Sequence, residues 1–287
     1  MKIAAAHLDS HFSGSDDPVG RMLERGPVVV LTGAGLSTSS GIPDYRDREG
    51  NWKRAQPIDH RDFLCSASAR QRYWARSFLG WPTVAQAAPG RGHQALAQME
   101  RLGRVELIVT QNVDGLHHKA GSSRVLELHG ALAAVICLSC ARSHPRAQVQ
   151  EWMTAANPGM ALEAAVAAPD GDADAAEEHY AGFAVPDCPA CGGLLKPDVV
   201  FFGDSVPKQR VTAAMDAITA AGGLLVVGSS LMVYSGFRFV EFARRAGKPV
   251  MAINLGITRA DHLLDAKVEQ DCNAFLDGLQ TRLMRHC

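Results

Sequence analysis

The sequence predicts an α/β protein, in which a Rossmann-like parallel-sheet domain carries a smaller inserted domain that is helical and metal-binding. Short apolar runs without strict alternation recur along the chain with helical stretches between them. This pattern is typical of parallel strands that are covered on both faces. Two segments interrupt the pattern, and one of them contains two pairs of closely spaced cysteines. A length of 287 residues also favours one larger domain with a smaller one.

Four apolar runs are the expected core strands of the sheet, and they span residues 28–32, 107–110, 224–227 and 250–253. Each run is rich in leucine or β-branched residues, and small or polar residues follow it at once. Ligands of open α/β sheets bind beyond the carboxyl ends of the strands. The four strand ends therefore predict one shared ligand crevice.

Helices are expected over residues 92–102, 237–246 and 273–287, where apolar residues recur at helical spacing. Gly103 and Gly247 follow the first two stretches as stop signals.

Two regions break the alternation of strands and helices. Residues 44–89 are aromatic and rich in arginine, and we expect a helical insertion there. Residues 131–195 contain the cysteine pairs and an acidic, alanine-rich stretch, 163–178, which we expect to be a solvated loop or a marginal helix. We assign the larger, Rossmann-like domain to residues 21–43, 92–134 and 196–287, and the smaller domain to the helical insertion 44–91 and the metal module 135–195.

The charge and the N-terminal segment narrow the function classes. The net charge of −1 gives no electrostatic argument for binding nucleic acid or membranes. No apolar run approaches the roughly 20 residues that cross a bilayer. Residues 1–20 lack the apolar core of a secretory signal and the arginine-rich character of a transit peptide. We therefore expect a cytoplasmic protein and a monomer, without nucleic acid or membrane partners.

Four of the seven cysteines form two Cys-x-x-Cys pairs, Cys137 with Cys140 and Cys188 with Cys191. An odd cysteine count without a secretory signal argues against a disulfide framework. Two such turns bring four thiolates together in a tetrahedral site that suits Zn²⁺. Four protein ligands leave no open position, so one structural zinc ion is predicted. Two separate redox or core motifs are the alternative, and the weakly basic flanks disfavour a nucleic-acid knuckle.

A glycine-rich turn, residues 33–37, follows the first strand. Glycines there allow backbone N–H groups to approach a pyrophosphate. Thr38 stands where the usual dinucleotide fingerprint has a third small residue, and the usual acid about 20 residues later is not clearly placed. Dinucleotide binding therefore stays open and a hydride-transferring dehydrogenase is disfavoured, with a plain strand–helix turn as the alternative.

Longer motifs resemble those of the sirtuins, the Sir2-type NAD-dependent protein deacylases. Residues 33–46 resemble the first family signature, residues 110–117 the second, and residues 127–130 the segment with the catalytic histidine. The cysteine pairs and residues 196–204, 228–231 and 253–254 follow in family order, so the resemblance runs from about residue 28 to 272. Residues 70–76, 202–204 and 233–236 further resemble the class II branch, in a bacterial-type form.

The resemblance implies a reaction that joins NAD cleavage to lysine deacylation. Nicotinamide leaves, the acyl oxygen of a modified lysine takes its place on the ribose, and the acyl group ends on ADP-ribose. His129 is the implied base, since an ordinary histidine pKa of about 6.5 suits proton transfer near neutral pH. Asn112 would order the ribose and a water, Asp114 would accept from the nicotinamide amide, and Gln111 would contact the nicotinamide ribose.

The resemblance also implies the remaining site residues. The NAD site would contain Gly33, Ala34, Gly35, Ser37, Thr38, Pro43, Asp44, Tyr45, Arg46, Gln111, Asn112, Asp114, Gly228, Ser229, Ser230, Asn254, Leu255, Gly256 and Cys272. Within it, Tyr45 and Arg46 lie on a loop that would close over NAD. Ser229 stands where many sirtuins have threonine, which keeps a hydroxyl for phosphate contact. Cys272 is expected to be a small buried residue and not a nucleophile.

Substrates would be proteins with acylated lysines. The acyl-lysine tunnel would be lined by Val199, Val200, Phe201, Phe202 and Gly203, and the peptide would add as a strand. Tyr73 and Arg76 share a helix face and resemble a clamp for acidic acyl groups, with a surface or packing pair as the alternative.

Three function hypotheses follow from these motifs. The first is an NAD-dependent protein-lysine deacetylase or deacylase, including a lipoamidase-like or longer-chain form. The second is a mono-ADP-ribosyltransferase that uses the same NAD cleavage. The third is a weakly catalytic NAD sensor, which the presence of Asn112, Asp114 and His129 disfavours.

Overall fold

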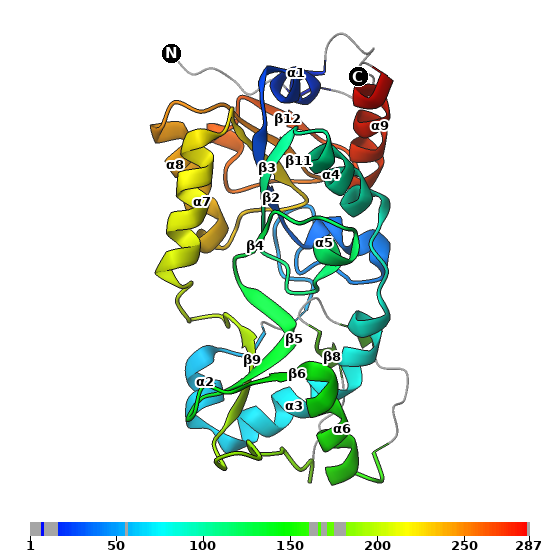
Figure 1. Cartoon of the computed structure of the whole chain (residues 1–287), viewed down its shortest axis with the longest axis vertical. Coiled ribbons are helices and arrows are strands. Elements are labelled where there is room, and N and C mark those ends of the chain that lie inside the picture. Colours follow the sequence, from blue (N-terminus) through cyan, green and yellow to red (C-terminus); the bar gives the residue numbers. More distant parts are fainter. Residues whose placement is uncertain are drawn as a thin grey trace.

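A computed structural model describes residues 7–8, 17–54, 57–160, 166–167, 171–174 and 182–285 of the chain. Its larger part is a parallel sheet covered by helices, and its smaller part lies beyond one end of that sheet (Figure 1). The sheet strands are β1 (His7–Leu8), β2 (Val28–Thr32), β3 (Val105–Thr110), β4 (Val125–Glu127), β10 (Leu224–Val227), β11 (Val250–Ile253) and β12 (Ala266–Val268). They lie in the order β1-β12-β11-β10-β2-β3-β4, and every neighbouring pair is parallel.

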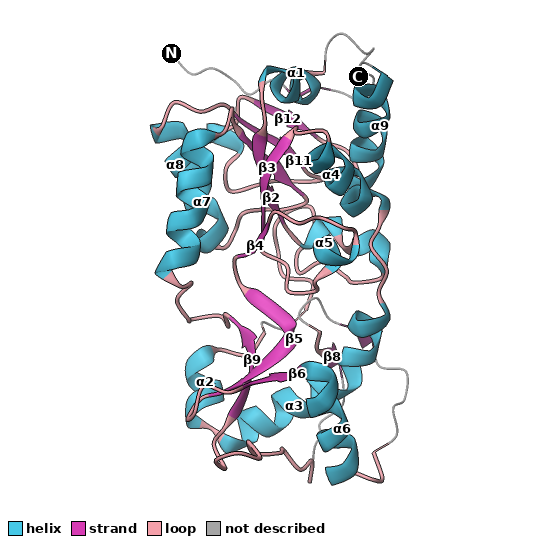
Figure 2. Ribbon diagram, in the orientation of Figure 1, coloured by secondary structure: helices cyan, strands magenta, loops and turns pink. Residues whose placement is uncertain are grey.

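Both faces of this sheet are covered, which explains why its core strands do not alternate in polarity. Val28 and Val30 of β2 pack with α1 (Pro18–Arg25), α4 (Arg91–Arg101) and α9 (Cys272–Arg285). Val29 and Leu31 face the other way and pack with α7 (Lys208–Ala220) and α8 (Tyr234–Arg245). Figure 2 shows these two helical layers on opposite sides of the sheet. All four side chains are fully buried, so the sequence needs apolar residues at every position.

The smaller part combines an antiparallel sheet with helices. Its strands β5 (Gly130–Cys137), β6 (Ser143–Pro145) and β9 (Leu195–Val199) lie in the order β6-β5-β9. The helices α2 (His60–Cys65), α3 (Ala67–Gln86) and α6 (Arg146–Ala156) pack on it (Figure 1). Phe63, Trp74, Phe78 and Phe201 lie in their common core. The short elements of the chain are α5 (Leu116–Lys119), β7 (Val166–Ala167), β8 (Ala173–Asp174) and the 3₁₀ turns η1 (Ala34–Leu36), η2 (Thr38–Ser40) and η4 (Asp261–Leu263).

Some local expectations need correction. Of the acidic stretch 163–178 only residues 166–167 and 171–174 are described, and within them Val166–Ala167 and Ala173–Asp174 pair as the two-residue strands β7 and β8. In the described part of the insertion 44–91 the first helix begins at His60, and residues 44–54 form a loop in which Arg46 and Trp52 make an isolated β-bridge. The short strands β1, β4 and β12 were not expected.

The strand order places a switch point in the middle of the sheet. From β2 the chain continues through β3 and β4 toward one edge, whereas β10, β11 and β12 extend toward the other. In open α/β sheets ligands bind at the carboxyl ends of the strands where the order reverses. The fold therefore directs attention to the ends of β2 and β10.

Among the described residues, no helix combines the length and the apolar character that crossing a membrane would require.

Candidate active site

Glycines make the ends of β2 and β10 approach each other closely. The backbone N–H of Gly35 donates to the carbonyl oxygen of Gly228 over 2.9 Å. A Cβ added at Gly33 would lie 2.7 Å from the Cβ of Ser229, and one added at Gly35 would lie 2.9 Å from the Gly228 oxygen. Gly228 also has a positive φ of 58°. This bare backbone at the switch point is a cradle that a pyrophosphate fits.

Gln111 connects this cradle to the next strand. It follows β3, and its side-chain amide donates to the carbonyl oxygen of Thr32 at 3.1 Å and to the hydroxyl of Ser229 at 2.9 Å. The Gln111 side chain is therefore fixed at the carboxyl ends of β2, β3 and β10.

Three polar side chains form a chain of hydrogen bonds below the cradle. The amide of Asn112 donates to the carbonyl oxygen of Gly33 and to the hydroxyl of Ser37, each at 3.0 Å. The Ser37 hydroxyl donates in turn to a carboxylate oxygen of Asp114 at 2.7 Å. The other Asp114 oxygen accepts the backbone N–H of Leu116 at 2.9 Å. This network fixes the orientation of the Asn112 amide.

His129 is held by hydrogen bonds at both ring nitrogens. Its Nδ1 lies 2.9 Å from the carbonyl oxygen of Gln111, and its Nε2 lies 2.8 Å from the hydroxyl of Ser235. A carbonyl oxygen only accepts, so Nδ1 carries the proton and the Nε2 lone pair of the neutral ring accepts from Ser235. Burial lowers the pKa of His129, and the positive charges of Arg210 and Arg238 lower it further. The ring is therefore neutral near pH 7 and can accept a proton at Nε2.

A cavity of about 610 Å³ joins these features. Predicted site residues that line it are Gly33, Ala34, Gly35, Asp44, Tyr45, Arg46, Tyr73, Gln111, Asn112, His129, Val199, Val200, Phe201, Phe202, Gly203, Gly228, Ser229, Ser230, Asn254 and Leu255. Segments that are far apart in the sequence thus surround one space, as the strand ends predict.

Other predicted residues lie outside the cavity lining. They are Ser37, Thr38, Pro43, Arg76, Asp114, Gly256 and Cys272. Ser37 and Asp114 reach it through the amide of Asn112. Cys272 is buried beside the cradle, where its thiol points to the carbonyl oxygen of Gly35 at 3.5 Å. Burial raises the pKa of this thiol to about 12, so it is no nucleophile near neutral pH.

The loop after the first signature is held by aromatic contacts. The guanidinium of Arg46 lies 3.9 Å from the ring centre of Trp52 and donates to the carbonyl oxygen of Gly50 at 2.7 Å. Tyr45 packs edge-on against Trp52 and Phe202, at centroid distances of 6.1 and 6.5 Å. Asp44 pairs with Lys53 at 2.5 Å. The loop thus lies against the segment expected to bind the acyl-lysine.

The apolar wall of the cavity comes from the smaller part of the fold. The ring of Phe201 lies 5.2 Å from those of Phe63 and Tyr73, centre to centre. Arg76, one turn from Tyr73 on α3, donates through Nε to the carboxylate of Asp172 at 3.0 Å and to the carbonyl oxygen of Ala173 at 2.9 Å. The structure therefore does not bring Arg76 together with Tyr73 at the cavity.

Two buried histidines lie behind the cradle. The Nε2 of His117 lies 3.0 Å from the hydroxyl of Thr32, and the rings of His93 and His117 are 4.9 Å apart. Neither nitrogen of His93 has a hydrogen-bond partner among the described residues. Burial lowers the pKa of His93 to about 4, so the ring is uncharged in the folded protein.

Sequence reasoning missed several residues that line this site, among them Trp52, Ser235 and Arg238. The sequence singles out Ser235 only as part of a branch-typical segment. The available signal was its position just after a strand-end loop, at the start of a helix.

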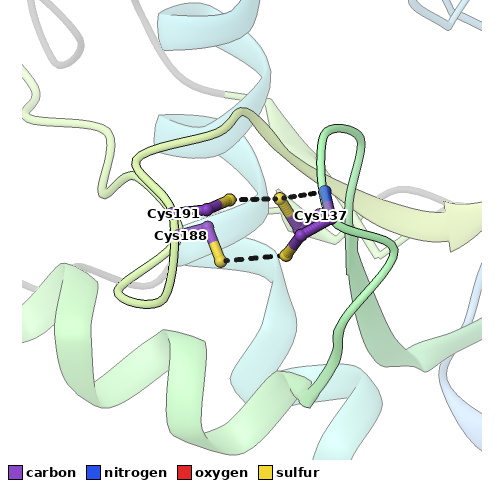
Figure 3. A group of neighbouring side chains, drawn as sticks. Cys137, Cys188 and Cys191 are labelled. Atoms are coloured by element: carbon purple, nitrogen blue, oxygen red, sulfur yellow. Dashed lines mark hydrogen bonds between the residues drawn. The ribbon is translucent and has the colours of Figure 1, made fainter.

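The four paired cysteines lie together, and Figure 3 labels Cys137, Cys188 and Cys191 among them. Their sulfur atoms all lie within 4.8 Å of one another, with Cys137 and Cys191 3.5 Å apart and Cys140 and Cys188 3.9 Å apart. Zn–S bonds of about 2.3 Å in a tetrahedron require sulfur separations of about 3.8 Å. The four thiolates therefore fit a structural Zn²⁺, as predicted. None of them lines the cavity described above.

Comparisons with known proteins place this geometry in a family. The family model described as Sir2 family matches residues 33–235. The chain is 56% identical over 253 residues, 88% of this chain and 86% of the relative, to an NAD-dependent protein deacetylase of Xanthomonas campestris pv. campestris (strain 8004). It is 48% identical over 258 residues, 89% and 82% of the two chains, to the NAD-dependent protein lipoamidase sirtuin-4, mitochondrial, of Bos taurus.

Solved structures agree with these relatives. The complex named Sir2-p53 peptide-NAD+ aligns with a TM-score of 0.73 at 29% identity, over 93% of this chain and 95% of that chain. A Sir2 homologue complex with ADP ribose aligns with a TM-score of 0.76 at 28% identity, over 94% and 97%. On the family match and the extent of these identities, the chain belongs to the Sir2 family.

Proposed function

We propose that this protein is an NAD-dependent protein-lysine deacylase, which transfers the acyl group of a modified lysine to ADP-ribose. The observation that carries the proposal is His129, a half-buried neutral base that lines the same cavity as the glycine cradle and the apolar wall, with its Nε2 next to Ser235. Names of relatives support it, since several are NAD-dependent protein deacetylases. NAD, when bound, supplies the ribose carbon that the acyl oxygen attacks and the ADP-ribose that accepts the acyl group.

The residues around the cradle fit such a dinucleotide. The backbone of Gly33 and Gly35 would bind the pyrophosphate, with the hydroxyls of Ser229 and Ser230 beside it. Asn254 and Leu255 line the cavity beyond β11 and would contact the adenosine half.

The remaining polar groups would act on the reacting half. Asn112 would orient the ribose with an amide that Ser37 and Gly33 already fix. His129 would take the proton of a ribose hydroxyl at Nε2. Tyr45 and Phe202 would exclude water from the reacting carbon.

The wall formed by Val199, Phe201 and Tyr73 would hold the acyl chain. Its aromatic lining supports neutral acyl groups, and a lipoamidase-like or longer-chain activity is the second candidate. That candidate is favoured by the similarity to a relative named as a lipoamidase. The acidic-acyl clamp of Tyr73 with Arg76 receives no support, because Arg76 bonds to Asp172 and Ala173.

We also propose that the larger, Rossmann-like domain supplies the NAD site and that the smaller one, with the zinc module and α3, supplies the acyl wall. The Zn²⁺ held by Cys137, Cys140, Cys188 and Cys191 would stabilise the smaller domain and take no part in the reaction. A monomer in the cytoplasm, without nucleic acid or membrane partners, stays a prediction from the sequence.

One experiment tests the proposed function against transfer of ADP-ribose to protein. The protein is incubated with NAD and with acetyl, octanoyl or lipoyl lysine peptides, and nicotinamide and O-acyl-ADP-ribose are followed by mass spectrometry. We expect both products in equal amounts and none with His129→Ala. Nicotinamide release with labelled protein and an unchanged peptide would assign an ADP-ribosyltransferase instead, and no NAD turnover would contradict both.

A further inference from the structure

One cation at the cavity, Arg238, has no charged partner within the part of the chain that the structure describes. Arg238 lies in the second turn of α8 and lines the cavity, and its Nε is buried without a hydrogen-bond partner among the described residues. Its guanidinium lies 5.3 Å from the ring centre of Tyr234, one turn earlier on the helix. A buried hydrogen-bond donor without an acceptor costs about 1–3 kcal/mol. We therefore expect Arg238 to have a partner when substrate is bound.

The acids of the cavity are already engaged elsewhere. Asp44 pairs with Lys53 at 2.5 Å, and Asp204 lies 3.4 Å from His60. Asp47 accepts backbone N–H groups within its own loop. Within the described ranges, no ion pair includes Arg238. Arg46 and the exposed Lys208 are the other positive charges of the cavity lining, and Arg46 is held by Trp52 and Gly50.

The position of Arg238 places it near the catalytic base and away from the cradle for the pyrophosphate. Ser235, one turn earlier, contacts Nε2 of His129. A Cβ added at Gly236 would lie 2.4 Å from Oε1 of Gln111. Because glycine has no side chain, the start of α8 can approach Gln111, and with it His129, this closely. The charge of Arg238 acts on His129, whereas the anion cradle is made by other elements, at the ends of β2 and β10.

The cavity rim beside Arg238 is open to an incoming chain. Val233 and Tyr234 are exposed, Tyr234 by 51%, and both line the cavity. The segment from Phe202 to Val206, which follows β9, contributes a further part of the lining. A peptide that enters between these segments would lie near Tyr234, whose ring centre is 5.3 Å from the Arg238 guanidinium.

We infer that Arg238 is a specificity-determining residue, which binds a carboxylate carried by the acylated peptide. The inference rests on the proposed function. An acidic side chain near the modified lysine is the favoured source, because Arg238 lies beside the exposed rim residue Tyr234 and is not part of the aromatic acyl wall of Phe201 and Tyr73. A carboxylated acyl chain would present the same chemistry, and the experiment separates the two.

The test uses matched peptides that differ in one charge. Acetyl-lysine peptides with neutral flanks carry either Glu or Gln at one position from three residues before to three residues after the modified lysine. The ratio of kcat/KM for Glu over Gln is measured at low salt, together with Kd from fluorescence anisotropy of labelled peptides. We expect a ratio of about five at the best position, since a half-exposed charge-assisted hydrogen bond is partly screened.

Three variants test whether Arg238 causes the preference for Glu over Gln. Arg238→Gln is expected to lower the ratio to about one, and Arg238→Lys to retain part of it. Arg245→Gln, an exposed residue of the same helix, is the matched control and should retain the whole ratio. Melting temperature and zinc content are measured for all three to check the fold.

A second arm compares succinyl-lysine with acetyl-lysine on the neutral peptide. If only the succinyl preference falls in Arg238→Gln, the carboxylate comes from the acyl chain. An unchanged Glu/Gln ratio with an unchanged succinyl preference overturns the inference, as does a rise in the Kd for NAD alone. Anisotropy needs no turnover, so a protein that cleaves no NAD would contradict the proposed function while the binding ratio still decides the role of Arg238.

Discussion

The Nε2 atom of His129 lies 2.8 Å from the hydroxyl oxygen of Ser235, at the start of α8. The opposite ring nitrogen faces the carbonyl oxygen of Gln111. The loop after β3 and the helix after β10 thus fix the imidazole of His129 between them. The neutral ring carries its proton on Nδ1, so Nε2 is free to act as the base. A substrate hydroxyl that donates its proton to Nε2 would replace the hydrogen bond from Ser235.

Ser235→Ala is expected to lower kcat about three- to ten-fold, because the ring loses one of the two contacts that orient it. A hydroxyl that donates to Nε2 stabilises the neutral ring relative to the imidazolium. Without it the acidic limb of the kcat/KM profile should move to higher pH. Stopped assays between pH 5.5 and 9 measure both effects, with the exposed Ser143→Ala as the control. An unchanged rate and profile would show that Ser235 does not position the base.

Gly33→Ala is expected to weaken NAD binding at least about ten-fold, because the new methyl group would lie 2.7 Å from the Cβ of Ser229 and force the ends of β2 and β10 apart. Calorimetric titration with NAD measures the Kd, and thermal unfolding checks that the sheet is intact. Gly159→Ala is the matched control, since nothing lies within 4 Å of a Cβ there and φ is not positive. Equal affinities of the two variants would argue against a pyrophosphate at the ends of β2 and β10.

Cys188→Ser is expected to lose the bound zinc and to lower the melting temperature, because one thiolate of the four-sulfur site is removed. Zinc is counted by plasma mass spectrometry and unfolding is followed by circular dichroism. Cys65→Ser, an exposed cysteine outside the cluster, should keep one zinc per chain and the original melting temperature. Full zinc content in Cys188→Ser would mean that the metal, if present, lies elsewhere.

The sequence predicts the core of the sheet well, because β2, β10 and β11 are buried on both faces and need continuous apolar runs. The strand β4 (Val125–Glu127) is only half-buried at all three positions, so it has no such run. The sequence places the start of α8 three residues late, since its first turn, Tyr234 to Gly236, has no apolar periodicity.

The site residues, like the strands, divide into those that a local sequence pattern predicts and those that depend on tertiary packing. Residues within signatures, such as Asn112 and His129, could be assigned from their local motifs. Ser235 and Arg238 could not, because their roles depend on how closely the start of α8 approaches Gln111 and His129. Arg76 has the correct helical spacing from Tyr73, yet its partner Asp172 lies 96 positions away in the sequence. Helical spacing predicts which side chains share a face but not which charge from another segment reaches them first.

The free energy of unfolding should decrease as the pH falls, because the buried His93 takes up a proton when the protein unfolds. Burial lowers the pKa of His93 to about 4 in the folded protein, against 6.5 in the unfolded chain. Between these values the unfolded state binds more protons, so the contribution is complete above pH 6.5 and is lost as pH falls toward 4.

His93 alone should therefore lower the free energy of unfolding by about 2 kcal/mol between pH 7.5 and pH 5. Urea titrations at the two pH values measure the difference. His93→Leu removes the titrating group and should reduce the pH-dependent loss by this amount, even if the variant is less stable overall. The exposed His262→Gln is the control and should leave the loss unchanged, because that side chain is solvated in both states. The same pH-dependent loss in His93→Leu as in the unmodified protein would mean that His93 is not held neutral by burial.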